Sequence, residues 1–142
     1  MRRTVSKSFE FCYGHHLRFH AGKCKNLHGH NAKVIVTLAE HQPISAPAMV
    51  MDFGVLKMRV NKWLDENWDH AMVVAKEDTP LREMLAGIPD QKIYVMDGEP
   101  TAENMATVLL NILPMLFKNQ GVFVSQVDFY ETPDSLASVF VE

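Results

Sequence analysis

The sequence predicts an α+β domain with an antiparallel four-stranded sheet and two helices on one face. Apolar and polar residues alternate near both ends of the chain, as in strands with one buried face, whereas two central segments repeat apolar residues at helical spacing. The resulting order is strand, strand, helix, helix, strand, strand, in which hairpins join the strands. A chain of 142 residues is long enough for one such domain, residues 1–142, with a sizeable core.

The first two strands are expected to pair and to be separated by a long loop. Alternation over residues 5–11 predicts the first strand, and residues 28–38 carry the same pattern. Between them, residues 13–26 contain two glycines and many polar groups, and a loop of this length in a small domain usually has a function. Two prolines predict a turn over residues 42–47, after which the strand resumes at residues 49–51.

The two long helices are each expected to begin at a capping residue. Asp52 should cap a helix over residues 54–67, and Thr101 should cap a second helix that Pro114 ends or kinks. The remaining predicted elements are a turn of helix at residues 81–85, a strand at residues 92–96 and two closing strands at residues 122–131 and 136–141. A four-stranded sheet has two open edges, and natural proteins cover or pair such edges, which favours a homo-oligomer.

Composition and charge exclude several classes of protein. Apolar residues make up 47% and charged residues 22% of the chain, which is ordinary for a soluble globular protein. The net charge of -3 gives no general basic field, so no nucleic-acid partner is expected. Neither a membrane span nor a secretory signal is predicted, because no stretch approaches the required ~18 apolar residues and the N-terminus has no apolar run. Two cysteines do not make a disulfide framework, so a cytoplasmic protein with reduced thiols is favoured over a Cys12–Cys24 bridge.

A cluster of histidines predicts a metal site. Five of the seven histidines fall within residues 15–30, and the pair His28 and His30 would point to the same side of a strand. The third ligand must come from elsewhere in the cluster, where the candidates are His15, at the end of the first strand, and its competitors His16 and His20. Neutral imidazoles bind Zn2+ well, and three of them leave the fourth position open, as in catalytic sites. The alternative, polar loop histidines that bind nothing, is weakened by their clustering.

Cys24 is a candidate for chemistry rather than for metal binding. It lies four residues before His28, just outside the histidine pair. A thiol is mostly protonated at neutral pH and needs a cationic neighbourhood to react, which Lys23 and Lys25 could supply. The alternative is that Cys24 is a small buried apolar side chain, and its flanking lysines argue against that interpretation.

Six motifs follow one another along nearly the whole chain. They are Phe9-x-Phe11 leading to His15, Cys24-x-x-x-His28-Gly29-His30, Met51-Asp52-Phe53 with Leu56-Lys57, Asp69-His70, Pro100-Thr101-Ala102-Glu103-Asn104, and Tyr130-Glu131-Thr132. In this order they resemble the 6-pyruvoyltetrahydropterin synthase / 6-carboxytetrahydropterin synthase family. The sequence departs from the family at Cys12-Tyr13-Gly14, where small Ala or Ser residues are usual, and its segment 75–98 is longer than in minimal members.

The resemblance implies a T-fold, an antiparallel four-stranded sheet with two helices on one face, oligomerising into a barrel. Trimers would close the barrel and stack as a hexamer, a dimer of trimers, with the sites between subunits. Carried over to this sequence, the family's functional residues are His15, His28 and His30 for Zn2+, Cys24, Asp69 and His70 for catalysis, and Glu131 for anchoring the pterin. Thr101 is a weaker candidate for substrate binding, because a helix cap explains it equally well.

The resemblance also implies a substrate and a product. Three residues separate Cys24 from His28, as in the 6-carboxytetrahydropterin synthases of the 7-deazaguanine (queuosine) pathway. Such a zinc-dependent lyase would convert 7,8-dihydroneopterin triphosphate to 6-carboxytetrahydropterin, acetaldehyde and triphosphate. One alternative is a 6-pyruvoyltetrahydropterin synthase, which eliminates triphosphate from the same substrate. A further alternative is a non-catalytic relative that binds zinc or pterin.

Overall fold

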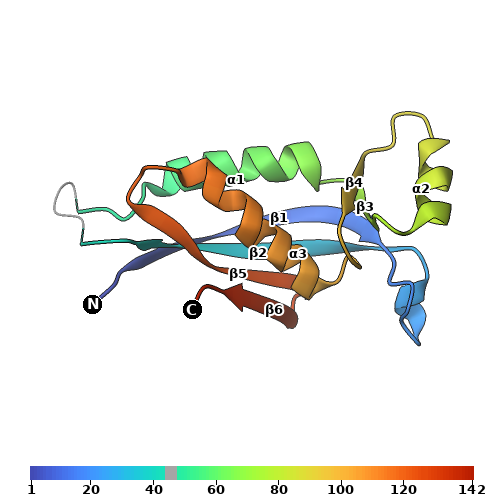
Figure 1. The fold of residues 1–142 in the computed structure, drawn as a ribbon, viewed down its shortest axis with the longest axis horizontal. Helices are drawn as coiled ribbons and strands as arrows, with labels where there is room; N and C mark the ends of the chain where they lie inside the picture. Colours follow the sequence, from blue (N-terminus) through green and yellow to red (C-terminus); the bar gives the residue numbers. More distant parts are fainter. Residues whose placement is uncertain (44–47) are drawn as a thin grey trace.

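A computed structural model describes residues 1–43 and 48–142 of the chain. Within these residues, six strands form one sheet in the order β4-β3-β1-β2-β5-β6 (Figure 1). The strands are β1 (Thr4–His15), β2 (His28–Glu40), β3 (Ala71–Ala75), β4 (Ile93–Met96), β5 (Val122–Thr132) and β6 (Ser135–Phe140). The predicted α+β class is therefore confirmed, whereas the predicted number of four strands is wrong.

The sheet is mixed rather than purely antiparallel. The pairs β1–β2, β2–β5 and β5–β6 are antiparallel, but β3 pairs in parallel with both β1 and β4. The sequence Ala-Met-Val-Val-Ala of β3 is apolar throughout, as is typical of a parallel strand that is covered on both faces, and gives no alternation from which to predict a strand. Of the two extra strands, β4 matches the short strand predicted over residues 92–96, whereas β3 was not predicted.

The connections after β2 differ from the prediction in one further respect. Residues 49–51 precede the first long helix without forming the expected continuation of the strand; Val50 and Met51 lie in a bend. The turn predicted over residues 42–47 falls mainly on residues 44–47, which lie outside the described residues.

Three α-helices occur in the described part of the chain, where two long ones and a single turn were expected. They are α1 (Phe53–Asn67), α2 (Thr79–Ala86) and α3 (Ala102–Ile112). Asp52 caps α1, since its side chain accepts hydrogen bonds from the amides of Gly54 and Val55, and Thr101 caps α3 in the same way. The α-helix α3 ends at Ile112, two residues before Pro114, and continues as a 3₁₀ turn, as expected from the missing proline N–H. No helix in the described ranges is both long enough and apolar enough to cross a membrane.

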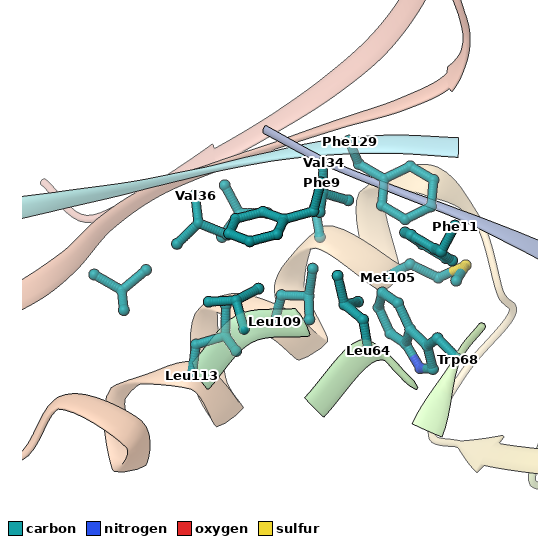
Figure 2. Packing of buried hydrophobic residues seen from close by; sticks show 14 of the residues in the cluster. Phe9, Phe11, Val34, Val36, Leu64, Trp68, Met105, Leu109, Leu113 and Phe129 are labelled. Atoms are coloured by element: carbon teal, nitrogen blue, oxygen red, sulfur yellow. The ribbon is translucent and has the colours of Figure 1, made fainter. Parts of the chain in front are cut away.

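The main core lies between one face of the sheet and the helices α1 and α3 (Figure 1). In β1, Phe9, Phe11 and Tyr13 are buried, while Ser8 and Glu10 on either side of Phe9 are exposed, because successive side chains of a strand point to opposite faces. Figure 2 shows the aromatic and aliphatic side chains of β1, β2 and β5 packed against those of α1 and α3. A smaller cluster packs α2 beside β3, away from this core.

Candidate metal centre

The register of β1 and β2 brings three histidines together. His15 lies opposite His28, and Tyr13 lies opposite His30, at the end of the two strands. Directly paired residues share a face of the sheet, so all three imidazoles lie on the face that the helices cover. The ring centroids are 4.6 Å apart for His15 and His28, 5.1 Å for His15 and His30, and 4.9 Å for His28 and His30.

Hydrogen bonds hold two of the rings with their Nε2 atoms toward one another. Nδ1 of His15 lies 2.7 Å from the carbonyl oxygen of Pro100, and Nδ1 of His28 lies 2.6 Å from that of Asn26. A carbonyl oxygen only accepts, so each Nδ1 carries the proton and donates it, which leaves the Nε2 lone pair free. An imidazole that binds a metal is normally held by this kind of bond from its other nitrogen.

The Nε2 atoms of His15, His28 and His30 are buried, and among the described residues they have no hydrogen-bond donor, only a carboxylate oxygen of Glu131 beside two of them. Most buried polar side-chain atoms have a partner, so three such nitrogens at one place require an explanation. A metal ion bound by the three lone pairs provides one, since neutral imidazole nitrogen is a good ligand for transition metals. The donor set of this cluster therefore fits a metal.

Glu131 of β5 also points into this cluster. Its Oε1 lies 3.1 Å from Nε2 of His15 and 3.0 Å from Nε2 of His30. Because the proton of His15 is on Nδ1, the lone pair of its Nε2 faces a carboxylate oxygen of Glu131. Only a cation between the two atoms, or an added proton, makes that contact favourable. The contact with His15 and the charge that the neighbouring imidazoles can carry lower the pKa of Glu131, although its burial opposes this. The sequence analysis treated Glu131 only as a substrate anchor, so its position as a potential fourth metal ligand was missed.

The environment of His30 favours the neutral form that binds metals. Burial is the main cause that lowers the pKa of this imidazole, and the nearby His15 and His28 add to the effect. The carboxylate of Glu131 acts in the opposite direction but does not outweigh burial. His30 therefore stays unprotonated to a lower pH than an ordinary histidine.

The metal-free protein is expected to become less stable as the pH falls below neutrality. Between the lowered pKa of folded His30 and the value of about 6.5 for an unfolded histidine, the unfolded chain binds more protons, so the free energy of unfolding rises with pH. Urea unfolding of chelator-treated protein at several pH values across this range measures how steeply the free energy of unfolding rises with pH. The His30→Gln variant should show a smaller slope, and a parent profile that is flat or falls with pH would contradict this assignment.

The two competing histidines are held elsewhere. Nε2 of His16 contacts Oδ2 of Asp78, and its Nδ1 lies 3.0 Å from the carbonyl oxygen of Lys25. Nδ1 of His20 accepts a hydrogen bond from the amide of Gly22 within the loop. Neither imidazole belongs to the cluster that Glu131 completes in the described part of the chain.

Asp69 and His70 form a contact within a single chain. Oδ2 of Asp69 lies 3.0 Å from Nδ1 of His70, at the turn between α1 and β3. The other oxygen, Oδ1, accepts a hydrogen bond of 3.0 Å from the amide of Cys12. Burial raises the pKa of Asp69, but this hydrogen bond and the nearby His70 and Lys92 outweigh it, so the net pKa is lowered. The carboxylate is thus held in its charged form beside the imidazole.

Cys24 lies apart from this pair in the described residues. It stands in a short 3₁₀ segment, Lys23–Lys25, is partly buried, and belongs to neither of the two clusters of potential metal ligands. Cys12, and not Cys24, lies beside Asp69 and His70. Both cysteines are free thiols, in line with the expectation of no disulfide. Thr101 caps α3 through its side-chain oxygen, 3.1 Å from the amide of Asn104.

Comparison with known proteins gives the same family as the sequence motifs. The family model described as 6-pyruvoyl tetrahydropterin synthase matches residues 4–142. The chain belongs to this family. A curated relative from Rickettsia felis, named 6-carboxy-5,6,7,8-tetrahydropterin synthase, is 39% identical over 135 residues, which cover 94% of this chain and 97% of that one. A relative of the same name from Haemophilus influenzae is 31% identical and covers 92% of this chain and 94% of its own.

Solved structures of other proteins share the fold. An uncharacterized protein from Wolinella succinogenes superposes with a TM-score of 0.86 at 27% identity and covers 100% of this chain and 99% of its own. The 6-pyruvoyl tetrahydropterin synthase of Caenorhabditis elegans superposes with a TM-score of 0.71 at 22% identity, over 100% of this chain and 97% of that one. At this lower identity, the second likeness is evidence for the fold alone.

Proposed function

We propose that residues 1–142 act as one tetrahydropterin synthase-like domain, a zinc-dependent 6-carboxy-5,6,7,8-tetrahydropterin synthase. It would convert 7,8-dihydroneopterin triphosphate to 6-carboxytetrahydropterin, acetaldehyde and triphosphate. The observation that carries the proposal is the convergence of three buried imidazole nitrogens, one from the end of β1 and two from the start of β2, the strand that follows Cys24. The names of the relatives from Rickettsia felis and Haemophilus influenzae support the choice of product.

The metal of this enzyme would be held by His15, His28 and His30. Bound Zn2+ supplies a Lewis acid that polarises substrate oxygen atoms and acidifies the adjacent C–H bonds. The carbonyl oxygens of Pro100 and Asn26 hold the imidazoles of His15 and His28 in the tautomer that this role requires. Burial of the three nitrogens keeps water from competing for them.

The remaining side chains would move protons and bind the substrate. Cys24 acts as the general base, and Lys23 and Lys25 on either side favour its thiolate. His70 passes protons from its exposed ring, held by the carboxylate of Asp69. Glu131 accepts hydrogen bonds from the ring N–H and amino groups of the pterin. Glu131 also lines a cavity of about 440 Å³ next to Glu103, which provides space for part of the substrate.

The separation of Cys24 from Asp69 and His70 favours an active site that is shared between subunits. We infer that Cys24 meets Asp69 and His70 when subunits form trimers that close a barrel and stack as a hexamer. The sheet has free edges at β4 and β6, and their pairing with neighbouring subunits would remove an exposed edge. A cytoplasmic location and a step in the 7-deazaguanine (queuosine) pathway complete the proposal.

The pyruvoyl-forming reaction is the second candidate. It is favoured by the description of the matching family model. Both reactions need the same substrate and the same metal, so the products distinguish them.

Incubation of purified, zinc-loaded protein with 7,8-dihydroneopterin triphosphate, with products identified by mass spectrometry, tests the proposal. The expected products are 6-carboxytetrahydropterin and acetaldehyde. A pyruvoyl product would replace the proposed reaction by the second candidate. Unchanged substrate in the presence of bound zinc would reject both.

The Glu131→Gln variant is expected to bind substrate weakly while keeping its zinc. Hydrogen bonds to a charged group contribute about 1.5–3 kcal/mol, so kcat/KM should fall about 10- to 100-fold, mainly through KM. Steady-state kinetics and metal analysis of the purified variant measure the two effects. Glu103→Gln, in the same cavity, is the matched control and should alter KM less. A Glu131→Gln protein without zinc would show instead that this carboxylate is a metal ligand.

A further inference from the structure

A second group of potential metal ligands lies on the opposite side of the sheet from the histidine cluster. One ligand atom each of Cys12, Asp69 and His70 lies within 4.8 Å of the others. Cys12 stands between the buried residues Phe11 and Tyr13 in β1, so its side chain points away from the helices. The Cys12 thiol thus lies on the other face of the sheet from His15, His28 and His30, although Cys12 and His70 line one cavity together with His28 and His30.

We propose that Cys12, Asp69 and His70 form a second binding site, for a thiophilic divalent cation such as Zn2+. Thiolate, imidazole and carboxylate are the three protein ligand types that zinc uses, at metal–ligand distances of about 2.0–2.3 Å. Such distances place tetrahedral ligands roughly 3.3–3.8 Å apart, so only small side-chain rotations are needed from the observed positions. His70 can make this adjustment, because its side chain is 77% exposed. The thiol proton of Cys12 passes to water when the metal binds.

The backbone already holds the three residues together. The amide of Cys12 donates to Oδ1 of Asp69, and the amide of His70 donates to the carbonyl oxygen of Cys12 over 2.6 Å. His70 has a φ of 61°, a backbone conformation that non-glycine residues adopt at an energetic cost and that is common at functional sites. These contacts explain the position of the Asp69 carboxylate, but they do not explain why a thiol faces an imidazole and a carboxylate.

The surroundings of the group leave room for a hydrated ion. A cavity of about 480 Å³ is lined by Cys12 and Asp69 together with Glu10, Asn31 and Lys33. The thiol lies 2.9 Å from Oδ1 of Asn31, which holds Sγ at the cavity wall. The ammonium group of Lys33 lies over the ring of Tyr130, 4.4 Å from its centre, and Glu10 adds a second carboxylate, so the cavity is not dominated by positive charge.

Cobalt(II) titration of the chelator-treated protein tests the second site. A thiolate ligand gives an intense charge-transfer absorption in the near ultraviolet, which a site of histidine and glutamate alone does not. The parent protein and Cys24→Ser are expected to show this absorption, and Cys12→Ser is expected to lose it while keeping the weaker visible bands of the histidine site. The His70→Ala variant should bind the thiolate-linked ion at least about tenfold more weakly, since even indirect partners of a metal contribute about 10- to 100-fold.

Each outcome decides the proposal. No charge-transfer absorption in the parent protein, or its persistence in Cys12→Ser, would overturn it. Loss of the absorption in Cys24→Ser instead would assign the thiolate to the other cysteine and would also overturn it. If Cys12→Ser failed to fold, the Cys24→Ser protein would still decide the matter, because Cys12 is the one cysteine that it retains.

One consequence rests on the proposed function. A cation held by Asp69 and His70 would remove this pair from proton transfer, so excess Zn2+ should inhibit the parent enzyme. Cys12→Ser should tolerate at least about tenfold more Zn2+ before losing half its activity. Absence of turnover in every protein would reject the proposed function and leave the cobalt result standing. Equal inhibition of both proteins by Zn2+ would show that the second site is not where excess Zn2+ inhibits the enzyme.

Discussion

Replacement of His28 by alanine is expected to lower zinc affinity at least about 100-fold and to abolish most activity. The change removes a metal ligand, and loss of a residue that merely hydrogen-bonds to a ligand already lowers metal affinity about 10- to 100-fold. The hydrogen bond of His28 Nδ1 to Asn26 directs its Nε2 into the cluster, and no other nitrogen in the loop takes that position. Metal analysis of the purified variant and turnover of dihydroneopterin triphosphate measure the two losses. The fold should persist, because His28 is only partly buried.

The matched control is His20→Ala. His20 lies in the same loop, is exposed, and makes only a local hydrogen bond with Gly22. This variant should keep the zinc content and activity of the parent protein. Full zinc occupancy in His28→Ala would remove His28 from the metal site, and zinc loss in both variants would indicate that the loop, rather than one ligand, determines metal binding.

The histidine cluster could be anticipated because it is built from local patterns. Alternation of apolar residues predicts β1 and β2, and antiparallel pairing of neighbouring strands places the end of one beside the start of the next. His15 is the last residue of β1 and His28 the first of β2, so the strands bring them opposite each other. The helix caps at Asp52 and Thr101 depend on residues only a few positions away and were predicted for the same reason.

The features that were missed depend on contacts between distant segments. Glu131 reaches the imidazoles only because β5 pairs with β2; the alternation with buried Val127 and Phe129 indicates the face of its side chain but not which strand lies beside it. Cys12 meets Asp69 because β1 also pairs with β3, a strand whose apolar sequence shows no alternation. Sequence patterns report the faces of single elements, whereas the order of strands in a sheet is determined by packing of the whole chain.

This distinction bears on the two cysteines. Cys24 was singled out by its distance from His28, whereas Cys12 was noted only as a departure from the family pattern. Within the described residues, the chain places Cys12 beside Asp69 and His70, and Cys24 outside that group. The proposed function therefore requires Cys24 to meet an Asp69–His70 pair of a neighbouring subunit, while the second metal site needs only one chain.

Replacement of Cys24 by serine is expected to lower kcat about 10²- to 10⁴-fold, the usual contribution of a general base, with zinc content unchanged. A serine hydroxyl has nearly the same size but does not ionise near neutral pH, so the change removes proton transfer and leaves packing intact. Single-turnover kinetics on zinc-loaded protein measures the effect on the chemical step.

Cys12→Ser is the matched control for this experiment, because it makes the same chemical change at the other thiol. It should retain the turnover of the parent enzyme when zinc is not in excess. If Cys12→Ser lost the activity and Cys24→Ser kept it, the base would be the thiol that already lies beside Asp69 and His70. The active site would then be complete in one chain, and the subunit contact inferred from the position of Cys24 would no longer be needed for catalysis.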